Sequence, residues 1–143
     1  MSAREYALKI ILRRRQSGKQ IYDKLLEKGF EEDEAEEAVS YYKEKGYIDD
    51  KDYARRFTSD SLKIKGHGKS RIIRDLKTKG ISDEDIEEAL SDAFFDLAPI
   101  MLKKFPVCES IKEKNKIINH FLRKGFSFSE INDALRENYI QEY

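Results

Sequence analysis

The sequence predicts an all-α protein made of three tandem three-helix repeats, about nine helices in all, stacked into an elongated, curved rod. Two observations predict this fold. A ten-residue pattern centred on a Lys-Gly pair occurs three times, and apolar residues recur around it at helical intervals of three and four. In addition, no segment alternates apolar and polar residues between turn pairs, as exposed strands would. We therefore expect helices and no sheet.

The three copies of the pattern are Ile21–Phe30, Ile72–Ile81 and Ile117–Phe126. In each copy, apolar residues stand eight and four positions before a glycine, a lysine directly precedes the glycine, and an apolar residue follows it. The glycines Gly29, Gly80 and Gly125 are 51 and 45 residues apart. Further apolar residues stand six, nine and ten positions after each glycine, so the repeated unit extends well beyond the pattern itself.

Each copy predicts the end of one helix and the start of the next. Glycine after lysine fits a left-handed C-terminal cap, because a side chain would clash there and a cation suits the helix dipole. Ser82 and Ser127 then read as N-caps, and Glu31 takes that place in the first repeat. A third helical stretch precedes each pair, over Tyr6–Arg15, Asp52–Ile64 and, more briefly, from Pro99 to Pro106. We expect a single helical-repeat domain over 1–143, with repeats at about 1–50, 51–97 and 98–143.

Charge follows the repeats, although 28 basic and 28 acidic residues leave the whole chain neutral. Segment balances are +5 for 1–30, −7 for 31–50, +7 for 51–81, −7 for 82–102, +5 for 103–126 and −3 for 127–143. The first two helices of each repeat are therefore basic and the third is acidic. The alternation has two readings. It solubilises the rod and pairs ions between neighbouring helices, or it gives the rod a basic side and an acidic side that steer a charged partner.

Under the second reading, the densest basic clusters form the binding face. We select Arg13, Arg14, Arg15, Lys19, Arg55, Arg56, Lys65, Lys69, Arg71 and Arg74. Such side chains would contact phosphates, and nearby tyrosines such as Tyr22 and Tyr47 would stack on bases or pack between helices. The neutral total argues against a simple nucleic-acid binder, which usually carries a basic excess.

The sequence contains no complete motif for catalysis, metal binding or nucleotide binding. Gly68-Lys69-Ser70 resembles the end of a P-loop, but Lys63 stands where the loop needs glycine and no strand precedes it. We interpret Gly66–Gly68 instead as a flexible loop, with Ser70 as the cap of the next helix. The acidic run at 49–52 lacks the later residues of a calcium loop and reads as a helix start. We predict no enzyme, no catalytic residue, no metal and no cofactor.

Two further classes are also disfavoured. The segment from Lys69 to Leu90 imitates a helix-turn-helix, but its second helix begins with acidic residues, which phosphates would repel. A sequence-specific operator binder is therefore a poor fit. The single cysteine, Cys108, suits a reducing compartment, and no apolar run is long enough to span a bilayer. We expect a cytoplasmic monomer that does not bind membranes.

The order of these short motifs resembles the RecX family. The helix ending in LRRR is followed by KLLEKGF, then by EKGYIDDKDYARRF, GKSRI and DLKTKGI. Glu44–Phe57 and Gly68–Ile81 are the most family-like stretches, and the similarity is strongest over residues 7–90. The third repeat departs more, through its short opening from Pro99 to Pro106.

The resemblance implies an all-helical tandem-repeat protein that binds RecA filaments on single-stranded DNA. It implies modulation, mostly inhibition, of strand exchange and ATP hydrolysis, by insertion into the filament groove. The basic face would then lie towards DNA or an acidic filament surface, and any direct contact with single-stranded DNA would be weak. The alternative from another class is a helical protein that binds single-stranded nucleic acid without RecA. Tight, steeply salt-dependent binding to bare DNA would distinguish that alternative.

Overall fold

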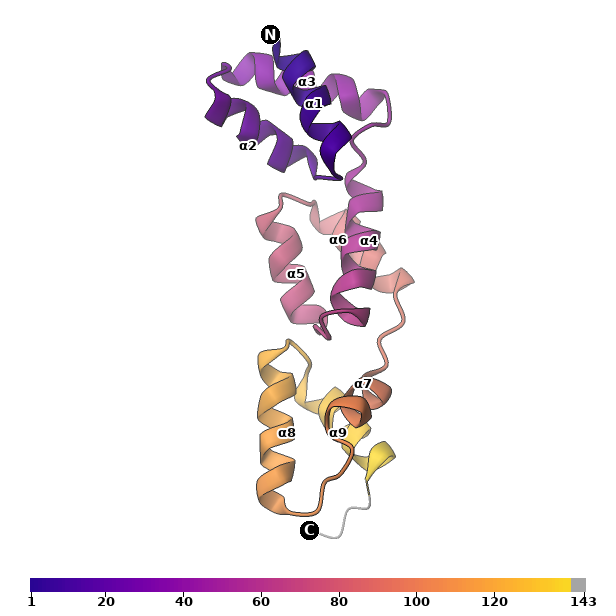
Figure 1. Ribbon diagram of the computed structural model, residues 1–143. Helices are drawn as coiled ribbons and strands as arrows, with labels where there is room; N and C mark the ends of the chain where they lie inside the picture. The colour runs from indigo at the N-terminus through magenta and orange to yellow at the C-terminus, as the bar shows by residue number, and fades with distance from the viewer. Residues whose placement is uncertain (140–143) are drawn as a thin grey trace.

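The computed structural model describes residues 1–139, which form nine α-helices and no strand. The first repeat contains α1 (Ala3–Arg13), α2 (Gly18–Lys28) and α3 (Glu32–Glu44); the second contains α4 (Asp50–Lys63), α5 (Lys69–Thr78) and α6 (Asp83–Asp92); the third contains α7 (Leu97–Lys104), α8 (Ile111–Arg123) and α9 (Phe128–Asn138). The three groups follow one another along an elongated rod (Figure 1). The predicted all-α class and the three-by-three grouping are confirmed. None of these helices is both long and apolar enough to cross a membrane.

The repeated glycine pattern is a C-terminal cap. Gly29, Gly80 and Gly125 have φ values of 108°, 79° and 100°, the left-handed region that other residues rarely adopt. In each case the residue after the glycine donates its backbone N–H to the carbonyl of the apolar residue four before the glycine, at 3.0–3.1 Å: Phe30 to Leu25, Ile81 to Leu76 and Phe126 to Phe121. This geometry explains why apolar residues stand at these two positions, since they meet beside the cap.

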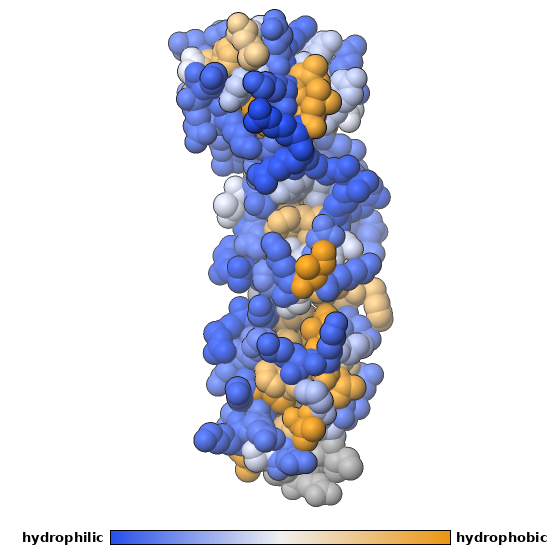
Figure 2. Space-filling view, viewed as in Figure 1, coloured by the Kyte–Doolittle hydropathy of each residue, from blue (hydrophilic) through white to orange (hydrophobic). Residues whose placement is uncertain are grey.

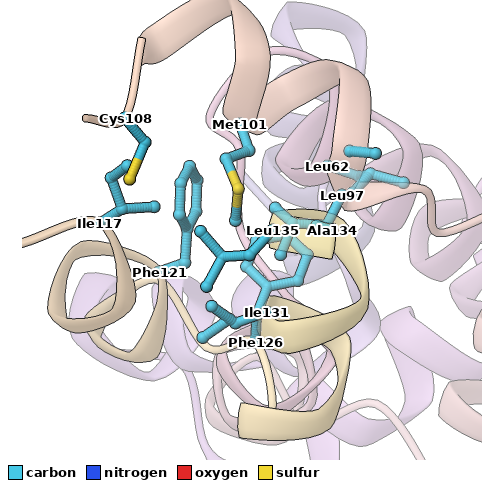
Figure 3. Close-up of a cluster of buried hydrophobic side chains, with 11 residues drawn as sticks. Leu62, Leu97, Met101, Cys108, Ile117, Phe121, Phe126, Ile131, Ala134 and Leu135 are labelled. Atoms are coloured by element: carbon cyan, nitrogen blue, oxygen red, sulfur yellow. The ribbon is translucent and has the colours of Figure 1, made fainter. Parts of the chain in front are cut away.

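Each repeat encloses its own apolar core. In the third, buried side chains of α7, α8 and α9 converge on one another, and Figure 3 shows Met101, Phe121 and Leu135 at its centre. The cores of the second and third repeats adjoin, because Leu62 at the end of α4 is buried in the third core and Phe95 packs against both. The core of the first repeat is built from residues 3–48 alone.

Hydrogen bonds to backbone carbonyls join consecutive repeats at the ends of their second helices. At the first junction, the Ser17 Oγ before α2 donates to the carbonyl of Lys79 at 2.7 Å. At the second junction, the Gly68 N–H before α5 donates to the carbonyl of Lys124 at 2.8 Å, and the Ser70 Oγ donates to the carbonyl of Gly125 at 2.9 Å. The two acceptor lysines are equivalent positions of the repeat. The same helix ends therefore meet at both junctions, through different donor groups.

These junctions place α2, α5 and α8 one after another along the same side of the rod (Figure 1). The C-terminal end of α5 faces the N-terminal end of α2. In the same way, the C-terminal end of α8 faces the N-terminal end of α5. Partial negative charge at each C-terminus thus meets partial positive charge at the next N-terminus, an arrangement that stabilises the junction. Four basic and one acidic side chain lie on each of α5 and α8, and three basic and two acidic on α2, so the column carries a net positive charge.

Residues 66–68 form a loop, as the sequence predicts, but the interpretation of Ser70 as the cap of the next helix is wrong. Gly68 is the N-cap residue of α5, and Ser70 instead bonds to the third repeat. His67 is only 8% exposed. A Cβ on Gly68 would lie 2.5 Å from the carbonyl group of Gly125, so the absence of a side chain is what allows the two backbones to meet. This segment is a packed junction.

The substitution Gly68→Ala tests that junction. Gly68 has φ −90°, which alanine adopts freely, so any loss of stability arises from the clash with Gly125. We expect the free energy of unfolding in urea to fall by about 1–3 kcal/mol, as for other overpacked sites. Small-angle scattering should also show a wider distribution of shapes, because the third repeat would no longer pack in one fixed position against the second.

The matched control is Gly46→Ala, at a glycine with φ 82° and open space around its Cβ position. It should lose about 1 kcal/mol from backbone strain alone and leave the scattering profile unchanged. A wild-type scattering profile for Gly68→Ala would contradict the proposed role of the Gly68–Gly125 contact.

Candidate charged interface

Three of the selected arginines converge on one carboxylate. Asp52, in the first turn of α4, accepts from Arg15 Nη1 at 2.7 Å, Arg55 Nη2 at 2.9 Å and Arg56 Nε at 2.9 Å. Arg15 belongs to the loop between α1 and α2, so this arginine cluster also ties the first repeat to the second. Each arginine side chain is about half exposed or more. Three guanidinium groups share one negative charge, and the cluster keeps a positive excess.

The arginine cluster holds Asp52 in its charged form. Burial opposes ionisation of the carboxyl, but the hydrogen bonds and charges of Arg56, Arg55 and Arg15 outweigh this effect. The pKa of Asp52 is therefore lowered below its ordinary value. The carboxylate remains an acceptor for the three arginines throughout the neutral range.

A second basic group lines a pocket of about 520 Å³ between α1 and α2. Arg13 and Arg14 lie there together with Lys24, Lys28 and a single acidic residue, Glu27. Lys28 also covers the ring of Tyr6, with Nζ 5.3 Å from the ring centroid. Sequence reasoning missed Lys24 and Lys28, although their spacing of four residues places them on one face of α2.

Two selected residues serve the junctions. The side chain of Lys19 fills the space that a Cβ on Gly80 would need, and Arg71 does the same beside Gly125. Their charges are also shared within their own helices: Lys19 Nζ lies 3.2 Å from an Asp23 oxygen, and Arg71 Nε lies 3.4 Å from an Asp75 oxygen. Both residues therefore support the rod as well as its basic side.

The remaining selected residues are spread along the second repeat. Lys65 follows the end of α4 and covers the ring of Phe57, while Lys69 at the start of α5 covers Phe95. Arg74 on α5 is exposed and forms no ion pair within residues 1–139. The structure thus brings together Arg15, Arg55 and Arg56 in one group, and Arg13 and Arg14 in another. It does not gather all ten selected residues into one patch.

Ion pairs between helices account for part of the charge alternation. Arg4 of α1 pairs with Glu37 of α3, Lys51 of α4 lies 3.3 Å from Glu88 of α6, and Lys43 of α3 lies 3.7 Å from Asp50 of α4. Because most of these groups are half exposed, each pair contributes little to stability. Cations that lack such partners are the stronger candidates for binding a ligand.

The described residues contain no group of three potential metal ligands. The pKa values of His67 and His120 are lowered below the ordinary value, first by burial and then by neighbouring cations.

The substitution Asp52→Asn tests the arginine cluster. The folded-state pKa of Asp52 is lowered, so its contribution is fully present above the unfolded-state pKa and is lost as the pH falls through the folded-state value. We expect the variant to lose about 1 kcal/mol of unfolding free energy at pH 7. That difference should shrink steadily below pH ~4. Urea unfolding across this range measures it, and a pH-independent difference would contradict the assignment.

Comparison with known proteins gives consistent matches. Residues 3–41 match the model of the RecX first three-helix domain, and residues 49–90 match that of the second. The chain is 36% identical to the regulatory protein RecX of Clostridium botulinum over 96% of its own length and 68% of that protein. It is 32% identical to the RecX of Vibrio parahaemolyticus, over 94% of this chain and 90% of that one.

Structural similarity extends over the third repeat as well. The crystal structure of RecX from Lactobacillus salivarius superposes with a TM-score of 0.80 at 26% sequence identity, covering 94% of this chain and 93% of the other. The family, the repeat architecture and the regulatory class of the relatives all agree with the resemblance found in the sequence. The chain belongs to the RecX family of regulatory proteins.

Proposed function

We propose that this protein binds the RecA filament assembled on single-stranded DNA and lowers its recombinase and ATPase activities. It does so as a cytoplasmic monomer, with no chemistry of its own. Membership of a family of regulatory proteins supports the proposal. The single structural observation that carries it is the column formed by α2, α5 and α8 along the length of the rod, three helices that each contain more basic than acidic residues.

A column of cations on a rod suits a filament better than a compact partner. A filament presents the same subunit surface at regular intervals, and a rod of three similar units can contact more than one subunit at once. Contacts made in this way add through effective concentration, so individually weak contacts can give tight binding overall. The acidic α3 and α6, each with six acidic side chains, leave the opposite sign available to a basic part of the same partner.

The direct test is the rate of DNA-dependent ATP hydrolysis by RecA on single-stranded DNA, titrated with this protein at two salt concentrations. We expect inhibition at amounts well below those that would coat the DNA, because the protein acts on the filament. Unchanged hydrolysis by intact filaments would refute the proposal. Inhibition only at coating amounts, with steep salt dependence, would favour the alternative of a RecA-independent single-strand binder.

The substitution Arg74→Glu tests the basic column. Arg74 is exposed and has no ion pair in the described part of the chain, so reversing its charge should spare the fold. We expect the concentration for half-maximal inhibition to rise several-fold, with the largest effect at low salt, because surface electrostatics is least screened there. Arg71 is less suitable for this purpose because it packs against Gly125.

The matched control is Arg136→Glu on the acidic α9, where Arg136 pairs with Asp133 on the surface. It imposes the same charge change outside the column and should leave inhibition unchanged. Equal weakening by both substitutions would indicate an effect of net charge alone and would argue against the column as the contact surface.

A further inference from the structure

A pocket of about 430 Å³ at the boundary of the second and third repeats is lined by five lysines. Lys63 and Lys65 come from the end of α4 and the segment after it, Lys103 and Lys104 end α7, and Lys124 follows α8. We call this group the lysine pocket. Its members lie far apart in the sequence and meet only because the second junction brings the end of α4 beside α7 and α8.

The lysine pocket carries uncompensated charge. No acidic residue lines it, and none of its five lysines forms an ion pair with any residue from 1 to 139. The arginine cluster differs, since Asp52 neutralises part of its charge. Like charges gathered in one concave site repel one another and raise the local positive potential, so a bound anion would relieve the repulsion.

Four of the other residues that line the pocket are apolar. Leu62, Ile100 and Phe121 form its floor, and Ile64 at the rim is 78% exposed. His120 also lines it, with its ring edge-on to Phe121 at a centroid distance of 4.8 Å. In the space-filling view of one face, hydrophobic surface is most abundant over the third repeat (Figure 2). The site therefore combines a cationic rim with an apolar interior.

We propose that the lysine pocket binds single-stranded nucleic acid, with backbone phosphates on the lysines and an unstacked base over the apolar floor. A single strand offers closely spaced phosphates together with bases that are free to turn outward. A duplex keeps its bases stacked inside and has nothing to place on the floor. An acidic peptide is the weaker match, because planar arginine is the better partner for carboxylates and this rim contains only lysine.

The setting of this site in a filament rests on the proposed function. The site adds to that function a direct contact between the rod and the single strand. The binding event itself requires only nucleic acid. It can therefore be measured with no RecA present, and its failure is distinct from a failure of the filament test. Loss of strand binding with intact inhibition would overturn only the site, and the reverse result would overturn only the filament proposal.

The test is fluorescence anisotropy of a labelled oligothymidine with the full chain, at several salt concentrations. We expect Lys103→Gln together with Lys104→Gln to weaken binding at least tenfold. The slope of log affinity against log salt should also fall by about 1.4, since each single-strand phosphate contact contributes about 0.7. The matched control, Lys9→Gln with Lys45→Gln, removes the same charge from exposed positions outside both the pocket and the basic column. It should change affinity less than twofold.

Equal losses in the two double variants, or no binding by the wild type, would overturn the site. Competition of the wild-type complex separates the possible ligands. A poly-glutamate peptide that displaces the strand more effectively than unlabelled oligothymidine would overturn the nucleic-acid assignment in favour of a protein partner. Thymidine triphosphate as effective as the oligonucleotide would overturn the strand as the source of the nucleotide.

His120 provides an independent readout inside the pocket. Burial and the cations Lys124, Lys104 and Arg123 lower its pKa below the ordinary value. A bound phosphate would offset these cations, so we expect the pKa of His120 to rise when oligothymidine is added. Proton NMR can follow this, because the chain has two histidines and His120→Gln assigns the signal. An unchanged His120 pKa at saturating oligothymidine would place the strand elsewhere and overturn the proposal.

Discussion

The shape of this protein depends on one constraint: the end of each second helix must be a glycine. A left-handed residue is needed to turn the chain into the third helix, and this requirement applies equally to Gly29, Gly80 and Gly125. Gly80 and Gly125 also pack directly against the preceding repeat, because Lys19 and Arg71 occupy the space that a Cβ would need at these two positions. Around Gly29 that space is open. The glycine that ends each of these two helices therefore also forms part of the joint between repeats.

That joint determines how charge is distributed in space. Since the second helices follow one another end to end, their cations form a row, whereas α6 and α9 pack against α4 and α7. Each joint also brings the end of one first helix near the next repeat. At the first joint Arg15 reaches Asp52, and at the second the end of α4 meets α7 and α8. Two of the three basic groups, the arginine cluster and the lysine pocket beside α4, α7 and α8, therefore lie at boundaries between repeats.

The sequence was sufficient for the helices because their signals are local. Glycine after lysine, a serine cap and apolar spacings of three and four all act within one turn or two, and the structure confirms them at Gly80 and Ser82. The role of Gly68 was not predictable in this way. Its reason to lack a side chain is Gly125, 57 residues later, and a single sequence does not indicate that contact.

The same limit applied to the charged site. Local charge density selected Arg15, Arg55 and Arg56, but nothing local indicated that they share Asp52. The signal for the third repeat was present as the +5 balance of residues 103–126. It gave no reason to join Lys103 and Lys104 to Lys65, because that convergence depends on the second joint.

Charge density and available charge are therefore different quantities in this molecule. Residues 13–15 and 55–56 are the densest arginine segments in the sequence, yet Asp52 engages three of their guanidinium groups, and part of their binding capacity is used within the fold. The lysine pocket is less conspicuous in the sequence and has no internal partner in the described chain. Because an exposed internal ion pair contributes little to stability, a ligand phosphate can compete with Asp52 for the arginines at modest cost. At the lysine pocket it competes with water alone, which makes the second joint the more favourable place for a polyanion to begin binding.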